Sequence, residues 1–164
     1  MILGMSIANF TLFHVILSLI GIAAGVVVMF GLLSSKKLPT LTAVFLWTTV
    51  LTSVTGYFFP RDHILPSHIV GALSLVILAV ALYALYVRHL TGNWRWIYAV
   101  SAVASLYLNV FVLVVQAFLK IDALKALAPT QAEPPFVMAQ GVVLLSYIAV
   151  GFFAVTKFHP RAGA

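Results

Sequence analysis

The sequence contains no cysteine and very few charged residues. The lack of cysteine excludes disulfides, thiolate metal sites, cysteine-ligated iron–sulfur clusters and covalent c-type haem attachment. Only 7% of the 164 residues are charged, whereas 63% are hydrophobic. The mean hydropathy is +1.16, far above the range of soluble domains. The composition therefore predicts an integral membrane protein, with residues 1–164 forming one transmembrane domain.

Acidic residues are scarcer than basic ones, three against nine, which gives a net charge of +6. In a soluble protein this excess would indicate a nucleic-acid partner. Here the basic residues lie in short caps between apolar runs, where they act as topology signals. We therefore expect the lipid bilayer as the partner, and no nucleic acid.

Five apolar runs are each long enough to cross a hydrocarbon layer of about 30 Å. They predict an all-α helical bundle with five transmembrane helices, at about residues 7–33, 41–59, 67–87, 94–119 and 135–158. The first run has no basic residue before it and is too long for the apolar part of a cleaved signal peptide. We therefore expect it to be a retained membrane helix.

The distribution of basic residues predicts the orientation of the bundle. Three basic residues, Arg61, Lys120 and Lys125, lie on the side that also carries all three acids. By the positive-inside rule, the richer side is cytoplasmic, so the N-terminus is expected outside and the C-terminus in the cytoplasm. The richer side has six basic residues: Lys36, Lys37, Arg88, Arg95, Lys157 and Arg161.

The fourth run carries polar residues within a sector of about 100° of the helix. Such a stripe should face protein or water, and hydrogen bonds between helices are the structural explanation for it. The amides of Asn109 and Gln116 are the members that this explanation accounts for least, because each amide has four hydrogen-bonding sites. The stripe consists of Tyr98, Ser101, Ser105, Asn109, Gln116 and Lys120.

The first run places His14, Ser18, Gly21 and Gly25 on one helix face. The two glycines form a small-xxx-small step that permits a close helix approach, so His14 is expected to point into the bundle. The second run is rich in threonine, which usually bonds back to carbonyls of its own helix. In the fifth run, the face that contains Gln140 is expected to meet the polar stripe of the fourth.

A metal or haem site is one interpretation of the histidines. Asp62, His63 and His68 come after the second run, and His14 could join them as a fourth ligand of a transition metal. A looser likeness to small b-type cytochromes rests on His14 and His68 as an axial pair. The spacing from His63 to His68 is not an established ligand spacing, so a solvated loop and a helix-terminal histidine are the structural alternative.

Placed by depth, the polar residues of several runs converge in the outer half. We expect one outward-facing ligand pocket, roofed by a structured loop over Ala128–Pro135. Its predicted lining is His14, Asn109, Gln116, Lys120 and Gln140.

The segment Leu108–Phe136 reads LNVFVLVVQAFLKIDALKALAPTQAEPPF. It resembles the signature of a family of small uncharacterised bacterial inner-membrane proteins, most specifically over the fourth and fifth runs and their loop. The resemblance implies a multi-pass protein of the bacterial inner (cytoplasmic) membrane. It brings no activity with it.

Three functions therefore stay open. The pocket could bind a metal, haem or small ligand; the stripe could line the path of a proton or small-solute channel or transporter component. The chain could also be a non-catalytic accessory or assembly subunit, in a homo-oligomer or a larger membrane complex. A classical hydrolase is disfavoured, because the sequence has no local nucleophile signature, no HExxH and no paired intramembrane carboxylates.

Overall fold

A computed structural model describes residues 1–60 and 66–160 and confirms the all-α membrane bundle with five transmembrane helices. Each long helix is apolar enough to cross a membrane. Three shorter elements complete the described part: the 3₁₀ turn η1 (Gly56–Phe58), the π-helical turn η2 (Tyr83–Val87) and the helix α5 (Asp122–Leu127). The long helices are α1 (Ile7–Leu33), α2 (Pro39–Thr55), α3 (Pro66–Leu82), α4 (Trp94–Lys120) and α6 (Pro134–Lys157).

The helices begin where local chemistry favours a start. The Ser6 hydroxyl accepts a hydrogen bond from the backbone N–H of Asn9 and so caps α1. Prolines open α2, α3 and α6, and proline fits the first turn because its missing N–H would have no helical partner there. When η1 and η2 are counted as the ends of α2 and α3, the observed bounds lie within one or two residues of the runs expected from hydropathy.

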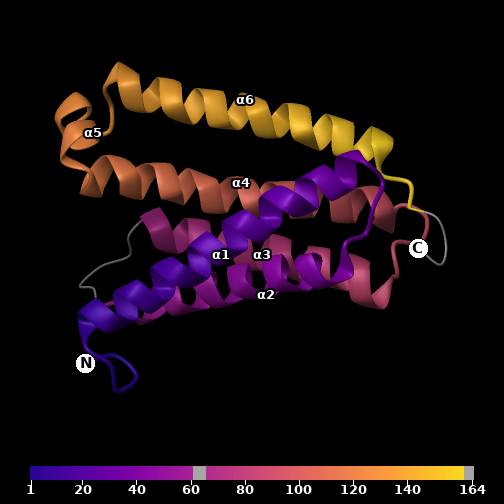
Figure 1. Ribbon diagram of the computed structural model, residues 1–164, viewed down its shortest axis with the longest axis horizontal. Coiled ribbons are helices and arrows are strands. Elements are labelled where there is room, and N and C mark those ends of the chain that lie inside the picture. The colour runs from indigo at the N-terminus through magenta and orange to yellow at the C-terminus, as the bar shows by residue number, and fades with distance from the viewer. Residues whose placement is uncertain (61–65, 161–164) are drawn as a thin grey trace.

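The chain runs back and forth along one long axis, so its described ends lie at opposite ends of the bundle (Figure 1). One end, here called the acidic end, carries Asp122 and Glu133 together with the start of α1. The other, here called the basic end, carries the loop between α1 and α2, the start of α4 and the end of α6. Its basic residues in the described chain are Lys36, Lys37, Arg88, Arg95 and Lys157.

Helix α4 lies between α3 and α6, while α1 packs mainly against α2. Helix α6 is at the edge of the bundle and contacts α4 and α1; Figure 1 shows the last turns of α1 beside those of α6. Large apolar side chains are exposed on all five long helices, as expected where lipid is the solvent. The well-buried side chains toward the basic end include Leu32, Phe45, Leu46, Leu78, Tyr98 and Phe158, whereas Phe10 is buried near the acidic end.

The closest helix approach is between α1 and α2. A Cβ atom at Gly21 would lie 2.9 Å from the Thr48 hydroxyl oxygen, and one at Gly25 would lie 2.9 Å from the Phe45 ring. Thr48 and Thr49 donate their hydroxyls to carbonyls of the preceding turn of α2. The glycine step and the threonine back-bonding are therefore present as the sequence predicts.

Candidate functional site

His14 is half-buried on α1, near the acidic end, and is held by α2. Its Nδ1 lies 2.8 Å from the Thr55 hydroxyl oxygen, and that hydroxyl is 2.7 Å from the Leu51 carbonyl. A hydroxyl has one hydrogen, and a carbonyl can only accept, so Thr55 donates to Leu51. With the Thr55 hydrogen on the Leu51 carbonyl, Nδ1 donates to Thr55, and in the neutral ring Nε2 is left with its lone pair. Within the described residues, Nε2 receives no hydrogen bond.

One aromatic ring packs against this imidazole. The His14 and Phe59 rings meet edge to face with centroids 5.3 Å apart, and Phe59 in turn packs on the buried Phe10 at 5.1 Å. Gly56 leaves room on the same side, because a Cβ there would lie 3.7 Å from His14 Cε1. The ring is therefore fixed by one hydrogen bond and an apolar wall, an arrangement that orients a ring nitrogen for a ligand.

Asn109 is the second polar side chain at this face of α1. The Ser18 hydroxyl donates to Asn109 Oδ1 at 3.5 Å, and Ser18 lies one helical turn from His14. Asn109 Nδ2 is buried and has no partner among the described residues. It lies over Gly21, whose missing side chain leaves the space that the amide uses. An unpaired buried donor calls for a bound group or water.

Two glutamines join the part of α4 nearest the acidic end to the next loop and to α6. Gln140 Nε2 on α6 donates to the Phe111 carbonyl at 3.1 Å, and Gln131 Nε2 in the loop donates to the Val115 carbonyl at 2.9 Å. Gln140 Oε1 is buried and has no partner in the described part of the chain. Gln140 therefore meets the backbone of α4, where the sequence predicted contact with the polar stripe.

The remaining members of the predicted pocket lie apart from His14. Gln116 and Lys120 are both exposed on the last turns of α4. Of the stripe on α4, Tyr98, Ser101 and Ser105 are buried toward the basic end. The five predicted lining residues therefore occupy three surroundings: His14 with Asn109 along α1, Gln140 between α6 and α4, and Gln116 with Lys120 on the surface.

The loop after α5 has internal structure. The Glu133 carboxylate accepts hydrogen bonds from the backbone N–H groups of Thr130 and Ala132 and from the Thr130 hydroxyl. Desolvation acts to raise the pKa of this carboxyl, but the hydrogen bonds from Thr130 and Ala132 outweigh it and lower the pKa. Gln131 takes a positive φ of 60° while its side chain anchors the loop to α4. The expected cap over this end of α4 is thus a hydrogen-bonded unit.

The metal candidates are only partly described. Asp62 and His63 lie outside the described residues. His68 is buried at the start of α3, where its ring is 5.5 Å from the Tyr57 ring and its carbonyl accepts the Tyr57 hydroxyl. His14 therefore has Thr55 and Phe59 as neighbours, whereas His68 has Tyr57. Residues 1–60 and 66–160 contain no group of three metal-binding side chains.

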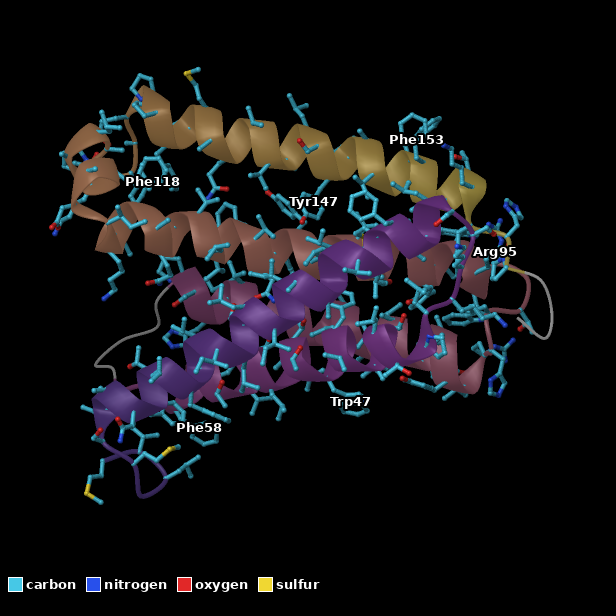
Figure 2. All side chains as sticks on the ribbon, in the orientation of Figure 1. Trp47, Phe58, Arg95, Phe118, Tyr147 and Phe153 are labelled. Atoms are coloured by element: carbon cyan, nitrogen blue, oxygen red, sulfur yellow. The ribbon has the colours of Figure 1, made fainter. Side chains whose placement is uncertain are left out.

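Sequence reasoning missed two residues that the structure makes important. Thr55 was one of many threonines in the second run, and nothing in its spacing marked it as the partner of His14. Arg95 was read only as a topology signal, but its Nη1 donates to the carbonyls of Val155 and Phe158 at the end of α6. Its position at the basic end of the bundle is visible in Figure 2. The sequence does place Arg95 in the first turn of the fourth helix, on the same side of the membrane as the end of the fifth. This position could have indicated a contact with the last carbonyls of α6.

Comparisons with known proteins give no relative. No family model, curated protein or solved structure matches the chain. A function is therefore inferred from the geometry alone.

Proposed function

We propose that this integral membrane protein is a non-catalytic ligand-binding protein whose site is centred on His14. The observation that carries the proposal is the hydrogen-bond chain from His14 Nδ1 through Thr55 to the Leu51 carbonyl. It holds the neutral ring in the tautomer that offers Nε2 as an acceptor. Fixing the tautomer through the other ring nitrogen is how proteins prepare a histidine to contact a ligand.

The chemistry of the surrounding groups favours a small polar ligand over a bare metal ion. Asn109 Nδ2 is a donor and cannot ligate a metal, whereas it can bond an oxygen of a ligand. A membrane-soluble molecule with a hydroxyl group would donate to His14 Nε2, and a second oxygen of the same molecule would accept from Asn109 Nδ2, which lies beside Gly21 about two helical turns along α1 from His14. Phe59 and Phe10 would cover its apolar part.

The proposal is tested with a membrane-soluble phenol as the probe. The ¹⁵N resonance of His14 Nε2 is followed in protein labelled with [¹⁵N]histidine and embedded in bicelles. We expect a saturable shift of the His14 signal, which is assigned by its loss in His14→Gln. The shift should be kept in His159→Gln, because only the backbone of the exposed His159 makes a bond. An Nε2 resonance that does not respond to the phenol would contradict the proposal.

Haem or a transition metal at His14 is a separate outcome of the same preparation. Absorbance between 400 and 430 nm and elemental analysis are measured on the purified protein. If a haem band or bound metal is present and disappears in His14→Gln, the ligand of the His14 site is haem or a metal and not a small polar molecule.

A proton or small-solute channel component is the second candidate. Its support is the continuation of polar groups from His14 through Ser18 to Asn109 and the nearby Thr48. Proton flux into liposomes that is lost in Asn109→Leu would favour this role.

For either role, we propose a multi-pass protein of the bacterial inner membrane with the basic end in the cytoplasm. The support is the charge distribution and the resemblance of Leu108–Phe136. A copy of the chain or another subunit as partner is tested by native mass spectrometry.

A further inference from the structure

A groove separates α4 from α6 in the half of the bundle nearest the basic end. Its volume is about 460 Å³, and its lining is almost entirely apolar. Val100 on α4 and Leu144, Ile148 and Phe152 on α6 line it and are exposed, so the groove reaches the lipid-facing surface. Figure 2 shows Tyr147 pointing from α6 into the space toward α4. This groove shares no residue with the His14 site and concerns a different ligand.

The shape of the groove limits what can occupy it. Its lining on α6 runs from Leu144 to Thr156, about 18 Å at the rise of an α-helix. The groove is open on its lipid-facing side, where Val100, Leu144 and Phe152 are exposed. An apolar groove of this length that opens to lipid suits one acyl chain.

The guanidinium of Arg95 lies at the end of the groove nearest the basic end. Val155 lines the groove, and its carbonyl accepts a hydrogen bond from Arg95 Nη1 at 3.2 Å. Nη1 also donates to the Phe158 carbonyl, and within the described chain the guanidinium makes no other hydrogen bond. Its Nη2 and Nε groups can then bind a phosphate in the two-pronged geometry that arginine favours.

The charge around Arg95 has one sign. Lys157 comes directly after Thr156 on α6, and Lys36 and Lys37 lie in the loop that Ser35 ties to the backbone N–H of His159 at 2.8 Å. The two acids of the described chain, Asp122 and Glu133, are at the opposite end of the bundle. An anionic group at the end of the groove would therefore meet several cations and no carboxylate of the described chain.

We propose that this groove is a binding site for one anionic phospholipid. An acyl chain lies between α4 and α6, and the phosphate lies against Arg95. Tyr147 and Gly151 form the floor beside Val103, since a Cβ at Gly151 would be 3.7 Å from Val103 Cγ1. The bound lipid fills the space that the two helices leave open and offsets one positive charge of the basic end.

The test is competition for the site between phosphatidylglycerol and phosphatidylcholine. The protein is reconstituted from vesicles with equal amounts of both lipids, extracted gently and analysed by native mass spectrometry. We expect one retained phosphatidylglycerol per chain, with a preference of about tenfold over phosphatidylcholine. Both lipids carry the phosphate that Arg95 would bind, but only phosphatidylcholine adds a choline cation, which the surrounding basic residues repel. Gly151→Leu fills the groove and should reduce retention about tenfold.

Two variants keep this result interpretable. Gly141→Leu makes the same change on α6 where nothing lies within 4 Å of the added Cβ, so it should retain lipid like the wild type. Arg95→Gln should lower the retention of phosphatidylglycerol, and Arg95→Lys should keep most of it. Equal retention in Gly151→Leu and the wild type would overturn the proposal. Retention of a free fatty acid in place of a phospholipid would also overturn it. A dimer that dissociates in Gly151→Leu would likewise overturn it, because the groove would then be occupied by a second copy of the chain.

Discussion

The α1–α2 pair and the α4–α6 pair are held together by different kinds of contact. Between α1 and α2, glycines bring the backbones together, and a Cβ at Gly21 or Gly25 would lie less than 3 Å from a side chain of a neighbouring helix. Between α4 and α6, long side chains bridge a wider gap. Gln140 reaches the Phe111 carbonyl, Arg95 reaches the end of α6, and a groove of about 460 Å³ stays open.

The difference shows what holds helices together where lipid is the solvent. Burial of apolar surface gives no advantage over lipid, so association depends on close van der Waals contact and on polar links. The α1–α2 contact depends mainly on close van der Waals packing, and the α4–α6 contact depends mainly on polar links. We therefore expect the first contact to be sensitive to added volume and the second to be sensitive to loss of polar groups.

The largest effect should come from added volume at Gly25. A Cβ there would lie 2.7 Å from Leu106 Cδ1 and 2.9 Å from the Phe45 ring, so Gly25→Ala should destabilise the fold by about 1–3 kcal/mol. Gly151→Ala is the matched change in the α4–α6 groove, where the new Cβ makes an ordinary contact, and should cost less than about 0.5 kcal/mol. Unfolding in dodecyl sulfate, followed by tryptophan fluorescence, measures both. Equal costs would remove the distinction between the two contacts.

The next effect should come from Arg95. Arg95→Ala leaves the carbonyls of Val155 and Phe158 without their charged donor, and should cost about 1–3 kcal/mol in the same unfolding assay. Arg88→Ala is the control: it removes a basic residue of the same end that only stacks on Trp94, 5.5 Å from the ring centroid. Its expected cost is about 0.5 kcal/mol. A larger loss for Arg88→Ala would show that Arg95 does not link α4 to α6.

A smaller effect is expected for Gln140. Gln140→Met removes the bond to the Phe111 carbonyl, but it also removes an unpaired buried oxygen. Membrane hydrogen bonds contribute about 0.6 kcal/mol on average, so the net change should be below about 1 kcal/mol. Gln116→Met, at an exposed position of α4, should have no measurable effect. If Gln116→Met is the more damaging change, Gln116 has a role that its exposure does not explain.

The smallest effect should be the response of the Glu133 loop to acid. Because hydrogen bonds lower the pKa of Glu133 in the folded protein below its ordinary value of 4.5, the bonded loop is favoured above that value. This contribution is lost as the pH falls through the lowered pKa. The ¹³C shift of the Glu133 carboxyl, titrated by NMR, should give a pKa below 4.5, and the Thr130 amide should shift with it. A Glu133→Gln variant should lack the Thr130 transition.

Helix existence and bounds could be predicted from the sequence because long apolar runs and prolines determine them locally. Pro39, Pro66 and Pro134 open helices that hydropathy placed one or two residues later. Gly25 is a similar case, since the spacing of small residues predicts a close approach before the partner helix is known. The short helix α5 (Asp122–Leu127) lies between the fourth and fifth apolar runs, so hydropathy alone does not predict it.

The site could be predicted less well, because helix periodicity gives the face of a residue and not its partner. His14 was expected to face the bundle interior, but its bond to Thr55 depends on how α1 and α2 cross. Asn109 and Gln116 share a stripe in the sequence, yet the first meets Ser18 while the second is exposed. The single ligand pocket therefore stays a prediction. Of its five predicted lining residues, the structure places Asn109 beside α1, the helix that carries His14, and places the other three elsewhere.

The most direct test of the proposed site is the tautomer of His14 in the membrane. Protein labelled with [¹⁵N]histidine is studied by NMR in bicelles at neutral pH, with His14→Gln used to assign the signals. We expect a directly bonded hydrogen on Nδ1 and none on Nε2, because Thr55 donates to Leu51. A hydrogen on Nε2 with none on Nδ1 would show that Thr55 donates to the ring, and would contradict His14 Nε2 as the acceptor at the centre of the site.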